Sequence, residues 1–401
     1  MPDAWDGKHL VLLSGPMGSG HVRAAAALEA CARERYPGLR VTHVNVFDLM
    51  TFAQKKLFTS FYLGMLKHFP LGWSYLYRKL DSPAKRRSLV AWFFEFFRYH
   101  RLKNRLLRKL QELRPDYIIC THFLPAELLD RFKREKKITV PTAVVVTDFS
   151  LHWVYVRRHL DYFFVTSHEI AFRLTKRGIA PEKIYITGCP VFPVFAKTYS
   201  KSDLVGLRYE FGLPPRMLLV MVTMGGDSVG RLAEISQIVL KNFQDIGVIA
   251  LAGRKKEAYE SLLEVKKKYP DRMFPIPFTP RVADYLAISA VVITKPGGIS
   301  VSECLAMKKP MVIMDPIPGQ EERNTDYLLE RGLVSKATDE VSLIYKDVLL
   351  NSEVIDMETR QLNYYSRPLA GFDILAAVLD GKSDCRYLAG SWGDIRTMWN
   401  I

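Results

Sequence analysis

Residues 294–303 read TKPGGISVSE, and residues 316–324 read PIPGQEERN. The apolar run Ala290 to Ile293 predicts a buried strand, and residues 300–307 predict a short helix after a Pro-Gly-Gly turn. Free backbone N–H groups and the positive end of the helix dipole face such a turn, which makes it an anion site. We therefore expect a phosphate beside Pro296, Gly297, Gly298, Ile299 and Ser300.

Polar side chains follow this turn in both motifs. Glu303, on the helix, is placed to accept hydrogen bonds from a diol such as a ribose. The second motif opens another helix after a Pro-Gly turn, and its Gly319, Gln320, Glu321 and Asn324 suit sugar hydroxyls. One glycine pair after a strand is usually an ordinary turn. Both motifs together indicate a nucleotide sugar.

Length and composition limit the class of protein. A chain of 401 residues with 48% hydrophobic and 25% charged residues predicts two soluble domains with ample core. Five cysteines without metal-type spacing fit reduced thiols of the cytosol. We find neither a signal peptide nor 18 consecutive apolar residues. The expectation is a protein of the cytoplasm or of the cytoplasmic face of a membrane.

The net charge of +15 is concentrated in one segment. Residues 52–109 hold fourteen Lys/Arg against Asp81 and Glu95, together with fourteen of the 47 aromatic residues. Basic groups contribute about 1 kcal/mol each at an anionic membrane, and aromatic rings bury in its interface. We predict peripheral membrane contact through this segment, at residues that include Lys85, Arg86, Arg87, Trp92 and Phe93.

Two other interpretations of this basic-aromatic segment (residues 52–109) remain. Interleaved basic and aromatic residues also suit single-stranded nucleic acid, and amphipathic helices pack their aromatic residues into ordinary cores. No recognisable nucleic-acid module accompanies the charge, so we expect no nucleic-acid partner.

Strands alternate with helices along both halves, which predicts two α/β domains with parallel sheets. The first half begins with a strand at His9 to Ser14 and a glycine loop, and the second with a strand at Met217 to Thr223 and another glycine loop. Prolines and a polar run interrupt the pattern near residues 190–202. We predict domains at 1–196 and 197–365, and a C-terminal helix with a tail at 366–401.

The first glycine loop carries Gly18, Gly20 and His21. The dinucleotide fingerprint is absent because position 23 is Arg. A single histidine at a helix start is usually structural, but a histidine accepts protons near neutral pH and suits a general base. Asp148, at the end of a predicted strand, is placed either to orient His21, to act as the base, or to cap the next helix.

The second glycine loop and its neighbours suit a diphosphate. Gly225 and Gly226 admit it beside the main chain, with Thr223 as a donor. Arg254 either neutralises the diphosphate or forms a surface salt bridge. No Asp-x-Asp motif is present, so we expect no obligatory cation or cofactor, and helix dipoles and basic groups to stabilise the leaving diphosphate.

These motifs together resemble the lipid glycosyltransferases that include monogalactosyldiacylglycerol synthases and processive diacylglycerol glucosyltransferases. The family patterns T-K-P-G-G-(x)3-S-E, P-x-P-G-Q-E-x-x-N and G-x-G-H-x-x-A-A match residues 294–303, 316–324 and 18–25. A V-T-D segment at residues 146–148 and a G-I-x-x-x-K-I-x-x-T-G-x-P-V pattern at residues 178–191 extend the likeness. It covers about residues 9–335.

The resemblance implies a GT-B fold, in which two Rossmann-like α/β domains face each other across a cleft. It implies inverting transfer of a hexose from a UDP-sugar to a membrane diacylglycerol, with His21 on the acceptor side and the uracil held by main-chain groups of Phe278 and Val282. It also implies that the last helices cross back to the N-terminal domain. One departure is Arg323, which makes the sugar side more positive and leaves the hexose open.

Three other functions remain open from the sequence. The first is a transferase of the murein lipid-intermediate type, which moves N-acetylglucosamine. The second is a UDP-sugar 2-epimerase, which has no use for a basic-aromatic segment. The third is a membrane sensor of UDP-sugars without catalysis.

Overall fold

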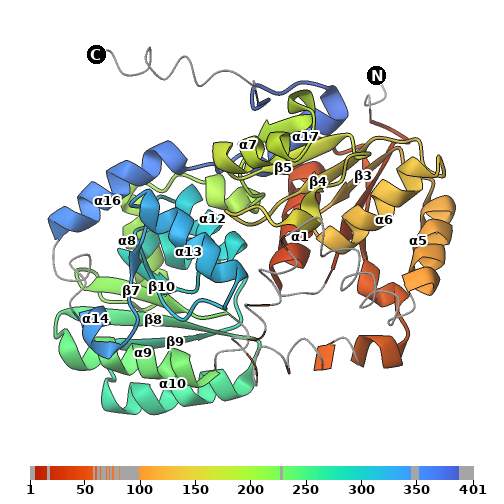
Figure 1. Ribbon diagram of the computed structural model, residues 1–401. Helices are drawn as coiled ribbons and strands as arrows, with labels where there is room; N and C mark the ends of the chain where they lie inside the picture. Colours follow the sequence, from red (N-terminus) through yellow and green to blue (C-terminus); the bar gives the residue numbers. More distant parts are fainter. Residues whose placement is uncertain are drawn as a thin grey trace. The chain divides into compact units, whose positions relative to one another are not determined.

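The computed structural model describes residues 5–15, 19–56, 99–225, 229–344 and 352–387, and the separate positions 59, 60, 64, 69, 72, 75 and 81. The chain divides into two compact units (Figure 1). Unit 1 comprises residues 1–192, 318–320 and 369–401, and unit 2 comprises residues 193–317 and 321–368. Each unit is an α/β layer structure around one parallel sheet.

The sheet of unit 1 has six parallel strands in the order β2-β1-β3-β4-β5-β6. Strand β1 reads HLVLLS and is buried throughout, as expected for a strand covered on both faces. The strands are β1 (His9–Ser14), β2 (Arg40–Asn45), β3 (Tyr117–Cys120), β4 (Thr142–Val145), β5 (Tyr162–Val165) and β6 (Ile184–Ile186). The helices and turns before residue 192 are α1 (Ser19–Arg35), η1 (Val46–Leu49), α5 (Tyr99–Leu113), α6 (Phe123–Arg134), η2 (Trp153–Tyr155), α7 (His168–Lys176) and η3 (Pro181–Lys183).

The alternating sequence of residues 40–48 predicts one strand that runs to Asp48, but β2 ends at Asn45. The Asn45 side chain accepts the Phe47 N–H at 3.1 Å, which caps η1 and turns the chain. The expected strand to Asp48 is therefore wrong over its last three residues.

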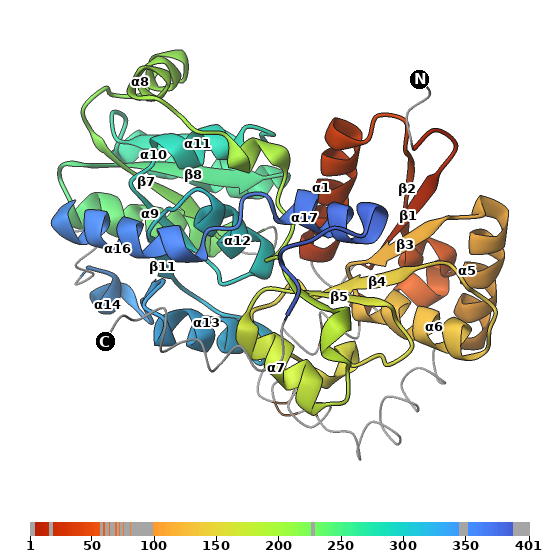
Figure 2. The same ribbon diagram turned by 90° about the horizontal axis from the view of Figure 1, so that it is seen from above.

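The C-terminal residues from Leu369 onward belong to unit 1. They include α17 (Ala370–Leu375) and a π-helical turn, η5 (Ala376–Asp380). Helix α17 lies beside α1 (Figure 2), and a Cβ at Gly371 would come within 2.6 Å of Cys31 Sγ. The two helices therefore meet at a position where only glycine fits.

Unit 2 contains a second parallel sheet, in the order β12-β11-β10-β7-β8-β9. Its strands are β7 (Leu218–Thr223), β8 (Ile246–Gly253), β9 (Met273–Pro277), β10 (Val291–Thr294), β11 (Met311–Ile313) and β12 (Ser335–Lys336). Its helices are η4 (Pro193–Ala196), α8 (Lys201–Glu210), α9 (Val229–Asn242), α10 (Lys256–Lys268), α11 (Val282–Ile288), α12 (Gly298–Ala306), α13 (Gln320–Glu330), α14 (Glu340–Ile344) and α16 (Ser352–Tyr365). Among the residues that the structure describes, no helix is long and apolar enough to cross a membrane.

The strand order locates a ligand site in each unit. In an open α/β sheet, ligands bind outside the carboxyl ends of the strands, where the chain reverses its direction of winding. That reversal lies between β1 and β3 in unit 1, and between β7 and β10 in unit 2. Thr223 and Thr294, the last residues of β7 and β10, are register partners. The loops that carry the sequence motifs therefore start side by side within each sheet.

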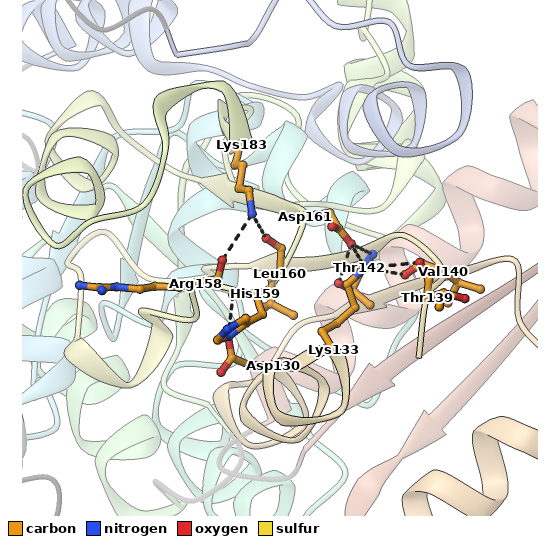
Figure 3. A network of polar contacts seen from close by, with 10 residues as sticks. All are labelled: Asp130, Lys133, Thr139, Val140, Thr142, Arg158, His159, Leu160, Asp161 and Lys183. Atoms are coloured by element: carbon orange, nitrogen blue, oxygen red, sulfur yellow. Dashed lines mark hydrogen bonds and ion pairs between the residues drawn. The ribbon is translucent and has the colours of Figure 1, made fainter. Parts of the chain in front are cut away.

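At the amino ends of its strands, opposite to the candidate ligand site, the unit 1 sheet is held by polar side chains (Figure 3). Asp161 Oδ2 accepts hydrogen bonds from Lys133 Nζ at 2.8 Å and from the Thr142 N–H and hydroxyl at 2.8 and 2.9 Å. Lys183 Nζ donates to the carbonyls of Arg158 and Leu160 at 3.3 and 2.9 Å. These contacts join the amino ends of β4, β5 and β6, away from the candidate ligand sites.

We expect Asp161→Ala to lower the free energy of unfolding of unit 1 by roughly 1.5–3 kcal/mol, because the variant leaves buried Thr142 without its charged acceptor. All six tryptophans fall in the residue ranges of unit 1, so urea unfolding followed by tryptophan fluorescence reports on this unit. The control is Glu112→Ala, whose exposed ion pair with Lys109 contributes at most about 1 kcal/mol. Equal stability of the two variants would contradict a stabilising role for the hydrogen bonds of Asp161.

Candidate functional site

His21 lies in the first turns of α1, where β1 has just ended, and it is buried with 6% of its surface exposed. Its Nδ1 lies 2.6 Å from the carbonyl oxygen of Thr121, which follows β3. The Thr121 hydroxyl donates in return to the His21 carbonyl at 2.7 Å. A carbonyl can only accept, so Nδ1 carries the proton and Nε2 holds a lone pair.

The surroundings of His21 keep its ring neutral near pH 7. Burial, the largest effect, lowers the pKa of His21 below 6.5, while the charge of Asp148 and the bond to Thr121 act in the opposite direction. A neutral ring with an unprotonated Nε2 is the form that accepts a proton. Gly20 is the second residue of α1, and Gly18 lies outside the described residues.

Asp148 follows β4 and is buried, with 6% of its surface exposed. Its backbone carbonyl accepts the Thr166 hydroxyl at 2.7 Å, which ties the chain after β4 to the end of β5. The segment 318–320 belongs to unit 1, and the Gln320 amide donates to both Asp148 carboxylate oxygens at 2.8 Å. The structure thus brings together Asp148, a candidate base, and Gln320, a candidate sugar ligand.

The loop after Asp148 is fixed by a residue that the motifs did not single out. Asp81 Oδ1 accepts the Trp153 backbone N–H at 2.7 Å and lies 3.6 Å from Arg177 Nη1. The Arg177 guanidinium sits over the Trp153 ring, 4.7 Å from its centroid. The only sequence signal was that Asp81 is one of two acids in a strongly basic segment.

In unit 2 the TKPGG motif forms the turn between β10 and α12. Gly297 is the N-cap residue, and the helix begins at Gly298, two residues before the predicted start. Gly297 leads into the helix with extended backbone angles of −70° and 133°. Ile299 packs into the core with 5% exposure, so only its main chain is available to a ligand, while Ser300 is half-buried.

Glu303 lies on the second turn of α12 with 6% of its surface exposed. Fully buried Asn324 connects the two motifs, since its amide donates to the Pro296 carbonyl at 3.1 Å. Glu321 accepts the Ile317 N–H at 2.8 Å and closes the loop that contains Gly319, whose φ is +91°. Residues 316–324 therefore help to hold the turn of residues 294–303 in place.

The loop after β7 lies beside this turn. Thr223 is half-buried, and Gly225 adopts a φ of +72° that favours glycine. Gly226 lies outside the described residues. Arg231, near the start of α9, donates to both carboxylate oxygens of Asp315 at 2.7 and 3.0 Å. Asp315 has a φ of +48°, so this pair holds a strained residue after β11.

Arg254 and Phe278 form a pair at the ends of β8 and β9. The guanidinium carbon of Arg254 lies 3.8 Å from the ring centroid of Phe278, which is 51% exposed. No ion pair of Arg254 is found among the described residues, so a cation–π contact takes the place of the surface salt bridge considered above. Val282 opens α11 close by in the chain.

The proposed membrane residues Lys85, Arg86, Arg87, Trp92 and Phe93 lie outside the described residues. The described end of the basic-aromatic segment is α5. This helix buries a leucine stripe in the core and exposes a basic stripe. The basic stripe consists of Arg101, Arg105 and Arg108.

Comparison with known proteins supports the resemblance. The model of the monogalactosyldiacylglycerol synthase family matches residues 21–191. A processive diacylglycerol beta-glucosyltransferase of Bacillus cereus is 26% identical over 356 residues, covering 88% of this chain and 87% of the relative. The Bacillus subtilis protein of that name is 28% identical, covering 81% of this chain and 82% of the relative.

Solved structures show the same fold. MurG of Acinetobacter baumannii has a TM-score of 0.60 at 14% identity and covers 93% of this chain and 99% of its own. A UDP-GlcNAc 2-epimerase from Neisseria meningitidis, bound to UDP-GlcNAc, has a TM-score of 0.57 at 12% identity and covers 93% of this chain and 100% of its own. The fold is the two-domain α/β GT-B fold. Together with the sequence relatives and the motifs, this confirms the resemblance to the family of monogalactosyldiacylglycerol synthases and processive diacylglycerol glucosyltransferases.

Proposed function

We propose that this protein is a UDP-sugar-dependent glycosyltransferase that moves a hexose to a membrane diacylglycerol. The observation that carries the proposal is the state of His21. Its Nδ1 proton is committed to the Thr121 carbonyl at 2.6 Å, which leaves Nε2 as an acceptor. A diacylglycerol has one free hydroxyl, and removal of its proton is the step that such a base catalyses.

The donor is assigned to unit 2. The turn between β10 and α12 offers backbone N–H groups to a diphosphate, and the N-termini of α9 and α12 add their dipoles. Glu303 accepts from the ribose hydroxyls, and the main-chain groups of Phe278 and Val282, four residues apart in sequence, hold the uracil. Arg254 adds positive charge near the ring of Phe278. The proposal requires no cofactor beyond the UDP-sugar.

A single base supports inversion at the sugar carbon. The deprotonated hydroxyl attacks the anomeric carbon from the face opposite the leaving UDP, and the bond to the diphosphate oxygen breaks as the new bond forms. A retaining reaction by double displacement needs a nucleophile on the enzyme as well. Asp148 is held by Gln320, and we assign it to stabilising the imidazolium of His21.

A second candidate is transfer of N-acetylglucosamine to a murein lipid intermediate. It is favoured by the likeness in fold to MurG, which is a likeness at 14% identity. Incubation with diacylglycerol vesicles and a panel of UDP-sugars, followed by mass spectrometry of the lipids, separates the two candidates. Glycosylated diacylglycerol supports the proposal, and its absence with every sugar refutes it.

We expect Glu303→Ala to weaken UDP binding by about 1.5–3 kcal/mol, or roughly 10- to 150-fold, through loss of charge-assisted hydrogen bonds to the ribose. Calorimetry measures the affinity, and circular dichroism verifies the fold. Glu330→Ala, which removes an exposed carboxylate of α13, serves as the control and leaves the affinity unchanged. A folded Glu303→Ala protein with wild-type affinity would exclude Glu303 from the site.

We expect His21→Ala to lower turnover by about 10²–10⁴ while the affinity for the UDP-sugar stays nearly constant. In the wild-type protein, the base acts only when neutral. Because burial lowers the pKa of His21, activity is retained down through pH 6.5 and is lost as pH falls through that lowered value. A pH–rate profile measures this loss of activity on the acid side. An acid limb well above pH 6.5, or near-normal turnover of the variant, would move the role of base to another group.

We also propose that the protein binds the cytoplasmic face of an anionic membrane peripherally, through the basic-aromatic segment. Replacing Arg101, Arg105 and Arg108 with Gln is expected to weaken flotation with anionic vesicles by about 3 kcal/mol if all three contact headgroups. The matched control replaces the exposed Lys266, Lys267 and Lys268 of α10 with Gln. Equal losses for both triple variants would show a general charge effect, and no loss for either would remove α5 from the contact.

A further inference from the structure

His122 follows β3 and lies beside His21, but no step of the proposed transfer uses it. The side chain is fully buried, and its Nδ1 accepts the Leu124 backbone N–H at 3.1 Å, which caps α6. A nitrogen that accepts from an N–H carries no proton, so the proton of the neutral ring is on Nε2. Within the part of the chain that the structure describes, Nε2 has no hydrogen-bond partner. Such a buried donor requires an explanation.

The neighbours of His122 fix how its ring lies. A Cβ at Gly15 would come within 2.7 Å of His122 Nδ1 and 2.8 Å of Cγ, so the bare glycine backbone packs on the ring. The Phe123 ring lies 4.3 Å away at a tilt of 30°. The ring of His21 stands at 87° to that of His122, with centroids 4.7 Å apart. Because Gly15 and Phe123 pack on the His122 ring, we infer that His122 turns an edge toward the face of His21 in this perpendicular contact.

An edge-to-face contact between imidazoles depends on charge. The edge of an aromatic ring is positive and its face is negative, so an N–H or C–H edge is attracted to a neutral ring. An imidazolium has lost that negative face, and the same edge repels it. Among the described residues, the other groups that face His21 are the Thr121 carbonyl, the Thr147 hydroxyl 3.3 Å from Nδ1 and the Asp148 carboxylate.

We propose that His122 is a positioning residue for the transfer, whose edge holds the His21 ring in place and favours the neutral form with an unprotonated Nε2. No bond is made or broken at His122. Burial, together with neighbouring His21, holds the pKa of His122 well below its usual range, so this histidine stays neutral while His21 gains and loses a proton. The inference rests on the proposed role of His21 as base.

The test compares His122→Asn with His152→Asn. His152 is also a buried histidine, and its Nδ1 accepts a cap bond from the Val154 N–H at 3.2 Å. No ring contact between His152 and His21 is found among the residues that the structure describes. Asn keeps an acceptor for the cap in both variants. Nitrogen NMR of the free protein follows the tautomer and titration of His21, whose signals are assigned by their loss in His21→Gln.

In His122→Asn we expect the His21 pKa to rise toward 6.5, because water replaces the ring and the positive edge is gone. The fraction of His21 with its proton on Nδ1 falls, since the ring is free to tilt. The acid limb of kcat/KM moves to higher pH by the same amount, and kcat falls by up to about 100-fold at unchanged KM for the UDP-sugar. The titration of His21 in His152→Asn matches that of the wild type.

His122→Phe covers the case in which the Asn variant does not fold, since Phe keeps the ring and its edge but carries no nitrogen. Its expected rise in the His21 pKa is smaller. A folded His122 variant with wild-type tautomer, titration and acid limb would overturn the proposal and leave His122 as a helix cap, and so would an equal shift in His152→Asn. The titration needs no substrate. A wild-type protein that glycosylates no diacylglycerol would therefore refute the proposed function, while the titration separately decides whether His122 controls the tautomer and pKa of His21.

Discussion

The hydrogen bond of 2.6 Å between His21 Nδ1 and the Thr121 carbonyl sets the chemistry of unit 1. It exists because β1 and β3 are neighbours in a parallel sheet, so that the start of α1 meets the chain leaving β3. The return bond from the Thr121 hydroxyl to the His21 carbonyl fixes the backbone as well as the ring. A buried histidine without a carbonyl acceptor here could carry its proton on either ring nitrogen. The winding of the sheet therefore decides which nitrogen can act as a base.

In unit 2, hydrogen bonds from neighbouring elements likewise hold the loops that follow the strands. If the turn after β10 binds a diphosphate as proposed, its backbone N–H groups are reserved for that ligand and cannot also hold the turn in place. Buried Asn324 supplies the missing constraint from the second motif, through its bond to the Pro296 carbonyl. The Arg231–Asp315 pair holds the chain after β11 in a backbone conformation that costs free energy. In both units, groups from a neighbouring element hold a loop that follows a strand of the sheet at the proposed ligand site.

Much of this could be predicted from the sequence, because buried parallel strands form continuous apolar runs and glycine turns mark their carboxyl ends. The TKPGG strand, turn and helix were predicted within two residues, since those elements are local. His122 was missed because nothing in THF at residues 121–123 shows that β3 pairs with β1, and only that pairing sets it beside His21. The contact of Arg254 with Phe278 joins residues from successive strands, which spacing along the chain does not reveal. Asp148 and Gln320 are farther apart still, and their contact depends on tertiary structure alone.

The charge of the basic-aromatic segment also could not be interpreted fully from the sequence, because a residue count does not show which charged side chains are exposed. Lys103 was counted among its cations, but it is buried, with Nζ bonded to both oxygens of Glu135 at 2.9 Å. That cation stabilises α5 against α6 and is unavailable to a membrane. Asp81 was counted as neutralising charge, but its carboxylate is engaged with the Trp153 N–H and Arg177. One cation and one anion therefore leave the count together, and the net excess of twelve is unchanged. On α5 itself, Arg101, Arg105 and Arg108 remain together on one exposed stripe, an arrangement that suits attraction to a flat anionic surface.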